Sequence, residues 1–174
     1  MDDFVSFGGV NYFILLGTLF FARGMDILST RVATPHLVLE ANPIVRKLGW
    51  KWSIVANLLF CIPLAVWPVP VIVIATASVL VAARNFQNAW LMRAFGEETY
   101  RAWHRDRFQE IGFSLYLVCL FGQTILTAAV GMALIWFSPA QLITESIGWG
   151  IVAYAVAVMF YTSLSLWRLR RTMG

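Results

Sequence analysis

Long apolar runs separated by short polar connections dominate the chain. Five runs cover residues 9–30, 52–67, 69–92, 111–137 and 147–167. Each is near the length that an α-helix needs to cross a hydrocarbon core of about 30 Å. The pattern predicts an all-α integral membrane protein, a single helical bundle over residues 1–174 with five transmembrane helices.

Positive charge is distributed unevenly among the connections. All thirteen Lys and Arg residues lie in the connections 31–51 and 93–110, in the C-terminal tail, or on the side of a run that leads to them. The other connections and the N-terminal segment carry only Asp2, Asp3 and Glu145 as charged residues. Because positive charge is retained in the cytoplasm, we expect the N-terminus outside, the C-terminus and both basic connections inside, and a multi-pass location in the inner (cytoplasmic) membrane of the cell.

Composition excludes several other classes of protein. Hydrophobic residues make up 60% of the chain, charged residues 13%, and the mean hydropathy is +0.73, which fits neither a soluble nor a disordered domain. The pI near 9.4 would suit nucleic acid, but the basic residues lie where membrane orientation alone requires them, so no nucleic-acid partner is expected. Neither the cysteines nor the histidines have a metal-binding spacing, so no metal site is predicted, and no cofactor can be named.

The connections 31–51 and 93–110 differ in character. The first mixes apolar residues with His36, Glu40, Asn42 and Arg46, and we expect it to lie at the membrane interface or to re-enter the membrane. The second carries charges of both signs and aromatic side chains, which predicts a short amphipathic helix on the membrane surface.

Polar side chains inside the runs are the candidates for a functional site. A charged group in the hydrocarbon costs about 2.5 to 3.5 kcal/mol on insertion scales and needs a partner. Their positions near the expected cytoplasmic ends of the helices predict one polar layer that opens to the cytoplasm beneath residues 34–49. Nearer the midplane, Gln123 and Thr124 are expected to make hydrogen bonds between helices. The candidate ligand-binding residues are Arg23, Asp26, Thr30, Glu40, Asn42, Asn57, Arg84, Asn85, Asn88 and Glu110.

Short motifs in the first third of the chain resemble a pattern found in a family of small prokaryotic membrane proteins whose activity is uncharacterised. Asp26-Ile-Leu-Ser-Thr30 fits D-x-x-x-T, and Glu40-Ala-Asn-Pro43 fits E-x-N-P after a short connection. The resemblance implies that Asp26, Thr30, Glu40 and Asn42 act as one unit. Asn42 and Pro43 would form a turn that delivers Glu40 toward Asp26 or an arginine.

A later segment looks like part of another family. Phe95-Gly96-Glu97-Glu98 with Tyr100 is similar to the F-G-E-E-Y segment of membrane methyltransferases related to isoprenylcysteine carboxyl methyltransferase. Here Thr99 is an extra residue and the expected upstream Arg-His-Pro element is missing. We therefore do not expect methyltransferase activity.

Three functions fit these observations. The first is a transporter or ligand-binding protein that works as a homo-oligomer. It would bind a small polar or anionic molecule or a lipid headgroup through Asp26, Arg84, Asn85 and Asn88. Arginine favours an anion because its guanidinium makes bidentate contacts with phosphate or carboxylate. The second is an enzyme acting on a lipid or isoprenoid, with Asp26 or Glu40 as general base and Arg84 stabilising negative charge. The third is a non-catalytic subunit or assembly factor, in which Asp26 forms only a structural ion pair with an arginine.

Overall fold

The computed structural model describes residues 4–40, 42–138 and 141–171. Within these ranges the chain forms six α-helices and no strand, so the all-α prediction is confirmed. The helices are α1 (Val10–Ala33), α2 (Pro43–Leu64), α3 (Pro68–Phe95), α4 (Glu97–Ile111), α5 (Phe113–Phe137) and α6 (Leu142–Arg171).

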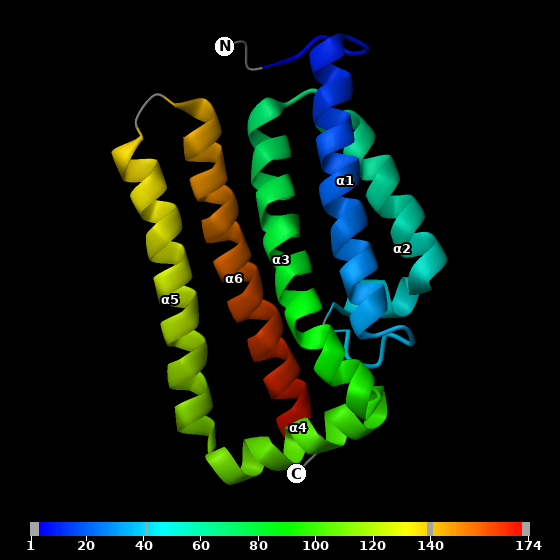
Figure 1. Cartoon of the computed structure of the whole chain (residues 1–174), viewed down its shortest axis with the longest axis vertical. Coiled ribbons are helices and arrows are strands. Elements are labelled where there is room, and N and C mark those ends of the chain that lie inside the picture. Colours follow the sequence, from blue (N-terminus) through cyan, green and yellow to red (C-terminus); the bar gives the residue numbers. More distant parts are fainter. Residues whose placement is uncertain (1–3, 41, 139–140, 172–174) are drawn as a thin grey trace.

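Five of the helices lie side by side, and α4 crosses one end of the bundle (Figure 1). Helix α3 is central, with α1 packed on one side and α6 on the other; α2 packs on α1, and α5 packs on α6. The order α5, α6, α3, α1, α2 describes an open layer of helices. Many large apolar side chains are exposed on it, as expected for helices that face lipid.

Four helices are long and apolar enough to cross a membrane, namely α1, α3, α5 and α6. The chain is therefore a multi-pass helical membrane protein. Helix α2, the predicted second span, is not among the four. It begins at Pro43, includes Arg46, Lys47 and Lys51, and is bent at Gly49, where φ is 71° and ψ is 178°, so only its second part is apolar.

A helix, α4, occupies most of the connection 93–110, as predicted, and its position on the membrane surface stays a prediction. It begins after Gly96 (φ 77°) and ends before Gly112 (φ 84°). Glycine adopts this left-handed conformation at little cost because it has no Cβ. The chain can therefore turn sharply at both ends of α4, which runs across the ends of its neighbours (Figure 1).

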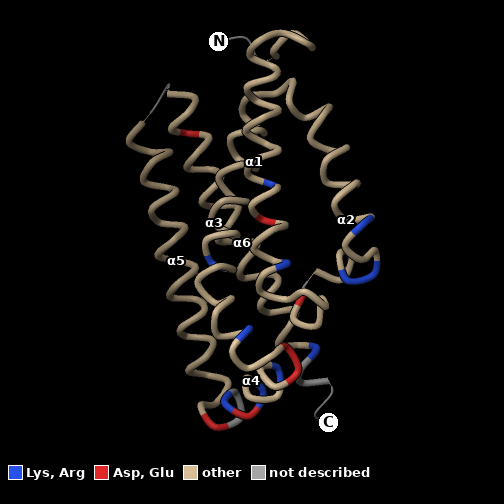
Figure 2. Tube along the Cα trace, turned by 45° about the vertical axis from the view of Figure 1, so that its right-hand side comes forward, with Lys and Arg blue, Asp and Glu red and all other residues tan. Residues whose placement is uncertain are grey.

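Charged residues gather at the end of the bundle where α4 lies, which we call the α4 end (Figure 2). The connection between α1 and α2 lies at the same end (Figure 1). At the opposite end, the far end, Glu145 occupies the first turn of α6. The two basic connections thus share one end of the bundle, as their spacing in the sequence predicts.

Helix α3 presents different faces to its two neighbours. Ala77, Leu80 and Val81 pack with Tyr116 of α5 against a cluster formed by α5 and α6. The face toward α1 includes Val71, which belongs to a cluster with Leu19 of α1. The buried residues of α3 recur every three, four or seven positions, as one face of a helix requires; they are Pro68, Val71, Ala75, Ser78, Ala82 and Ala89.

Glycines allow α6 to approach both α5 and α3. A Cβ atom added to Gly131 of α5 would lie 2.7 Å from the backbone oxygen of Gly148 in α6. In the same way, a Cβ atom added to Gly148 would lie 2.7 Å from the backbone oxygen of Gly131. A Cβ atom added to Gly150 would lie 2.8 Å from the backbone oxygen of Val73 in α3. Small residues at such contacts bring helix backbones close together in lipid, where packing drives association.

Candidate functional site

Arg23 of α1 is the centre of a hydrogen-bonded network that joins three helices. Its Nη1 donates to Asp26 Oδ2 at 2.9 Å and to Ser78 Oγ of α3 at 3.1 Å. Its Nε donates to Asn57 Oδ1 of α2 at 3.1 Å, and its Nη2 donates to the same oxygen. The side chains of Arg23 and Asp26 are only 28% and 18% exposed. Every nitrogen of this guanidinium therefore already has a partner within the protein.

A second polar contact between α1 and α3 lies closer to the α4 end. Asn85 Nδ2 of α3 donates to Thr30 Oγ1 at 3.0 Å and to Ser29 Oγ at 3.3 Å. Ser29 is fully buried and donates to the backbone oxygen of Asp26 at 2.8 Å. The structure therefore brings Thr30 and Asn85 together in the contact between α1 and α3, and Ser29 links Asn85 to the backbone of Asp26.

Two members of this network, Ser29 and Ser78, were missed by the sequence analysis. A serine in an apolar run resembles any other small residue that allows helices to approach. One signal was present, because Ser78 precedes Asn85 by seven residues and so lies on the same face of α3.

Among the described contacts, Arg84 does not meet Asp26, so their predicted grouping is not observed. The ion pair of Asp26 is with Arg23. Successive residues of a helix point about 100° apart, so Asn85 faces α1 while Arg84 follows the face of Ala77, Leu80 and Val81 toward α5 and α6. There Arg84 lies near enough to Tyr116 to interact electrostatically with its hydroxyl.

Asn88, the third candidate on α3, bonds within its own helix. Its Nδ2 donates to the backbone oxygen of Arg84 at 3.0 Å. This contact turns the amide back along α3, so the structure gives Asn88 no hydrogen bond to α1. The predicted grouping of Asn88 with Asp26 is therefore not observed among the described contacts.

Aromatic side chains continue from Arg84 into α4. The rings of His104 and Tyr116 meet edge to face with centroids 6.3 Å apart, and His104 stacks on Tyr100 at 6.0 Å. Burial lowers the pKa of His104 below its ordinary value of 6.5, so its imidazole is neutral at neutral pH. Among the described residues, the guanidinium of half-buried Arg84 has neither an ion pair nor a hydrogen-bond acceptor. This corner therefore combines an uncompensated positive charge with neutral polar rings.

Glu97, the first residue of α4, binds the connection between α1 and α2. Its Oε1 accepts a hydrogen bond from the backbone N–H of His36 at 2.8 Å. Its Oε2 accepts one from the N–H of Val38 at 3.0 Å and one from the Thr34 hydroxyl. The Thr34 oxygen in turn accepts from the N–H of Leu39 at 3.2 Å. One carboxylate thus organises the turn that follows α1.

The environment of Glu97 favours its charged form. The residue is only 9% exposed. Burial alone would raise the pKa of its carboxyl, but the hydrogen bonds from Thr34, His36 and Val38, together with the nearby His36 imidazole, lower the pKa below its ordinary value of 4.5. The sequence analysis treated Glu97 as a surface charge of an amphipathic helix, because a contact with a connection sixty residues earlier leaves no local signal.

The remaining candidates lie outside the network of Arg23. Glu40 Oε1 accepts from the N–H of Asn42 at 2.7 Å, and Asn42 Oδ1 accepts from the N–H of Ile44 at 2.9 Å. Asn42 therefore caps α2, with Pro43 in its first turn, and the predicted delivery of Glu40 toward Asp26 or an arginine stays a prediction. Glu110 was placed in the polar layer wrongly: it belongs to α4, is 56% exposed and pairs with Arg107.

The expected hydrogen bond between helices at Thr124 is also wrong. Its hydroxyl donates to the backbone oxygen of Leu120, one turn earlier in α5, at 2.7 Å. A threonine can satisfy its hydroxyl in this way without a neighbouring helix. Gln123 is exposed, so it does not mark a polar contact inside the bundle.

Comparison with protein-family models, with curated proteins and with solved structures returns no match to this chain. The family resemblance of the D-x-x-x-T and E-x-N-P segments therefore stays a prediction. Within the described ranges, no three His, Cys, Asp or Glu side chains are grouped so that they could hold a metal ion. Two polar regions within the bundle are therefore candidate sites, the network of Arg23 and the corner around Arg84.

Proposed function

We propose that this protein binds an anionic group at the α4 end of the bundle, with Arg84 as the principal ligand. One observation carries the proposal: Arg23 is already bound by Asp26, Asn57 and Ser78, whereas Arg84 has no acidic partner among the described residues. A guanidinium in or near hydrocarbon needs a counter-charge. Phosphate and carboxylate match its geometry and charge.

The depth of Arg84 in the membrane supports a ligand at the interface. Arg84 lies sixteen residues after Pro68, the first residue of α3, which is about 24 Å along the helix. If Pro68 lies at one boundary of a hydrocarbon core of about 30 Å, Arg84 lies about 6 Å from the other. A long side chain at this depth reaches the headgroup layer. Both a lipid phosphate and a free small anion could meet it there.

The neighbouring rings would help to select the anion. The imidazole of His104 can donate one hydrogen bond. Because burial keeps His104 neutral at neutral pH, this ring would add a hydrogen bond without adding charge. Arg84 would supply the electrostatic attraction, and α4 would cover the site from the aqueous side.

The proposal includes the orientation expected from the sequence. Helix α2 returns the chain from the α4 end to the far end (Figure 1), and we propose it as the fifth span although its apolar part, Trp52–Leu64, is only about 20 Å long. The α4 end would face the cytoplasm of the inner membrane. Labelling of Lys47→Cys and Val69→Cys in intact cells tests this: an impermeant reagent should reach only Cys at position 69, and the reverse pattern would refute the orientation.

Ligand-dependent stability tests the anion site directly. Thermal unfolding of the purified protein would be followed in a neutral detergent with increasing inorganic phosphate, and separately with a short-chain phosphatidylglycerol. A ligand at about 100 times its Kd should raise the free energy of unfolding by about 2.7 kcal/mol. We expect this gain in the wild type and its loss in Arg84→Gln.

Arg93→Gln provides the matched control, because Arg93 is an exposed arginine in the last turn of the same helix. It should keep the gain. Stabilisation by phosphate would identify a free anion as the ligand, and stabilisation by the lipid alone would identify a headgroup. An equal gain in Arg84→Gln and the wild type, or no gain with either ligand, would exclude the proposed site.

The other two functions stay proposals. Asp26 forms an ion pair with Arg23, as the hypothesis of a non-catalytic subunit expects, and an enzyme would need Asp26 or Glu40 as its general base. The homo-oligomer expected from the sequence is also a proposal, and the open layer of helices leaves surface for it. Native mass spectrometry of gently extracted protein would measure the number of copies, and a monomer alone would refute it.

A further inference from the structure

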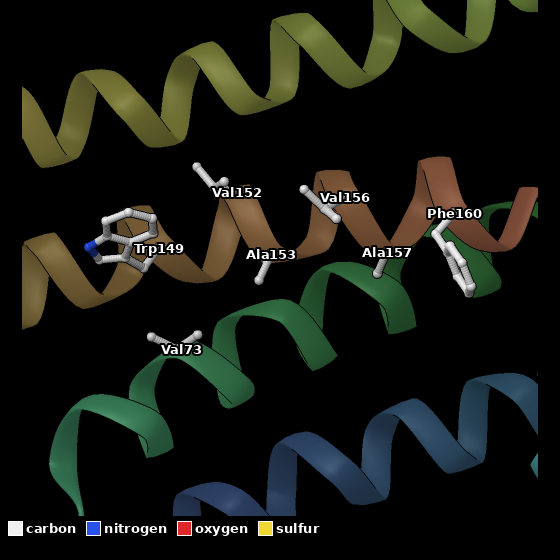
Figure 3. Close-up of a pocket in the computed structure, with 7 residues that line it drawn as sticks. All are labelled: Val73, Trp149, Val152, Ala153, Val156, Ala157 and Phe160. Atoms are coloured by element: carbon white, nitrogen blue, oxygen red, sulfur yellow. The ribbon is translucent and has the colours of Figure 1, made fainter.

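An apolar groove and a more polar pocket adjoin each other along the contact of α3 with α6. The groove has a volume of about 640 Å³ and is lined by Val73 of α3 and by residues of α6 from Trp149 to Phe160 (Figure 3). The pocket, of about 340 Å³, lies nearer the far end and includes Val69, Glu145 and Ser146. Trp149 lines both spaces, so they adjoin each other at this side chain.

The chemistry of this feature changes along its length. From Trp149 to Phe160 the groove follows α6 for eleven residues, or about 16 Å, and all of its lining side chains except the indole are purely hydrocarbon. Glu145 lies one turn before Trp149. In Figure 3 the indole nitrogen of Trp149 points away from Phe160, toward the end of α6 that carries Glu145. An elongated molecule with a polar head and an apolar tail matches this order.

The charge of the pocket indicates which polar head of a bound molecule would fit it. Glu145 has no ion pair among the described residues. All thirteen Lys and Arg residues belong to the basic connections, to the C-terminal tail, or to the parts of runs that lead to them, so none is in the segment around Glu145. Ser146 is only 2% exposed and its hydroxyl donates to the backbone oxygen of Leu142 at 2.6 Å, so the acceptors that the pocket presents are the carboxylate oxygens of Glu145. The pocket therefore offers a negative charge and acceptors to a cationic donor.

We propose that groove and pocket together bind one phospholipid whose headgroup ends in a primary ammonium. Its ammonium donates to the carboxylate of Glu145, and one acyl chain lies along α6 between Trp149 and Phe160. The indole N–H of Trp149 donates to a phosphate or ester oxygen, the role that tryptophan commonly has at a membrane boundary. A quaternary ammonium has no N–H to donate, so choline lipids bind less tightly. This site is separate from Arg84 and does not depend on the anion-binding proposal.

Competition between headgroups tests the site. The protein would be reconstituted in nanodiscs with equal amounts of phosphatidylethanolamine, phosphatidylcholine and phosphatidylglycerol of the same acyl chains, and lipids retained after gentle extraction would be counted by native mass spectrometry. The wild type should retain the ethanolamine lipid about tenfold over the choline lipid. Glu145→Gln should lose this preference while still retaining lipid through the groove.

Two further variants separate head from tail. Ala153→Phe places a ring in the groove and should lower retention of all three lipids, with a melting temperature measured alongside to confirm folding. Glu98→Gln removes an exposed acid from α4 and should behave as the wild type. The proposal is overturned if the wild type shows no ethanolamine preference, or if Glu145→Gln keeps it.

Discussion

The contact between α1 and α3 and the contact between α5 and α6 are built from opposite kinds of residue. The first uses Arg23, Ser78 and Asn85 in hydrogen bonds between helices. The second uses Gly131 and Gly148, each of which leaves no room for a Cβ atom. In lipid, apolar surface alone does not drive helices together, so either hydrogen bonds or close packing must do so. In this chain, hydrogen bonds between helices join α1 to α3, and close packing of glycines joins α5 to α6.

The comparison also explains which charge is available to a ligand. In the contact of α1 with α3, polar groups satisfy one another, and the charge of Arg23 is neutralised by Asp26. Arg84 leaves α3 on the other face, where its neighbours are aromatic or apolar. The guanidinium of Arg84 has no acidic partner among the described residues there, because the half of the bundle formed by α5 and α6 is held by close packing and not by polar contacts. The difference between the two contacts is what makes Arg84 the candidate ligand.

Removing Arg23 should have the largest effect on stability. In Arg23→Met the carboxylate of Asp26 and the Oδ1 of Asn57 would lose their donors, and breaking a buried ion pair commonly costs about 3 to 5 kcal/mol. We expect a loss of about 3 kcal/mol in the free energy of unfolding, measured by denaturant titration in detergent micelles.

The double variant Arg23→Met/Asp26→Leu is the control for this prediction. It removes the stranded carboxylate and should recover part of the loss, because an apolar pair does not have to be desolvated. A single variant as stable as the wild type would mean that the apolar packing of Leu19 and Val71 is enough to hold α1 against α3, and the contrast between the two contacts would disappear.

Adding one methyl group to the glycine contact should have the next largest effect. In Gly148→Ala the new Cβ would lie 2.7 Å from a backbone oxygen of α5, which a side-chain rotation cannot relieve. Overpacking of this kind typically costs about 1 to 3 kcal/mol, and we expect the upper part of this range in the same titration.

Gly122→Ala is its matched control in α5. A Cβ atom there would meet nothing within 4 Å, and alanine favours the helix over glycine by up to about 1 kcal/mol. The control should therefore be neutral or slightly stabilised. Equal losses in the two variants would show that helix propensity, not the approach of α5 to α6, determines the result.

Much of the fold follows from local patterns in the sequence. Apolar length identifies the four spans, the mixed charges of residues 93–110 identify α4, and the grouping of Arg23 and Asp26 follows from helical spacing. The predicted span 52–67 is not among the four, because Gly49 bends α2 and the basic residues of this helix shorten its apolar part. These features depend on neighbours within one or two helical turns, which sequence spacing describes well.

The site was harder to predict because it depends on which face each helix turns to its neighbour. Arg84 and Asn85 are adjacent in sequence, yet one faces Tyr116 and the other Thr30. Depth in the membrane can be counted from the sequence, but rotation about the helix axis is fixed by packing across helices. Glu97 was missed for a related reason, since its partners lie in a distant connection.

Replacing Glu97 should cause the smallest loss in the free energy of unfolding. It tests whether the hydrogen bonds that hold α1 against α3 continue into the connection between α1 and α2. Glu97→Gln keeps one oxygen for the donors from Thr34, His36 and Val38 but loses the charge and the second oxygen. Leaving buried donors unsatisfied costs about 1 to 3 kcal/mol. We expect about 1 to 2 kcal/mol at neutral pH, measured by thermal unfolding.

The pH dependence gives this prediction its sign. Because the folded pKa of Glu97 lies below its ordinary value of 4.5, the carboxylate stabilises the fold fully above pH 4.5, and this contribution is lost as pH falls through the folded pKa. The difference between wild type and Glu97→Gln should therefore shrink on acidification from about pH 6 to pH 3. All other titratable groups are the same in both proteins, so only the difference between them is informative. Glu98→Gln is the control, because Glu98 is an exposed neighbour in the same first turn, and it should follow the wild type at every pH. A loss of unfolding free energy in Glu97→Gln that does not change with pH would indicate that the shape of the side chain, and not its charge, fixes the connection between α1 and α2.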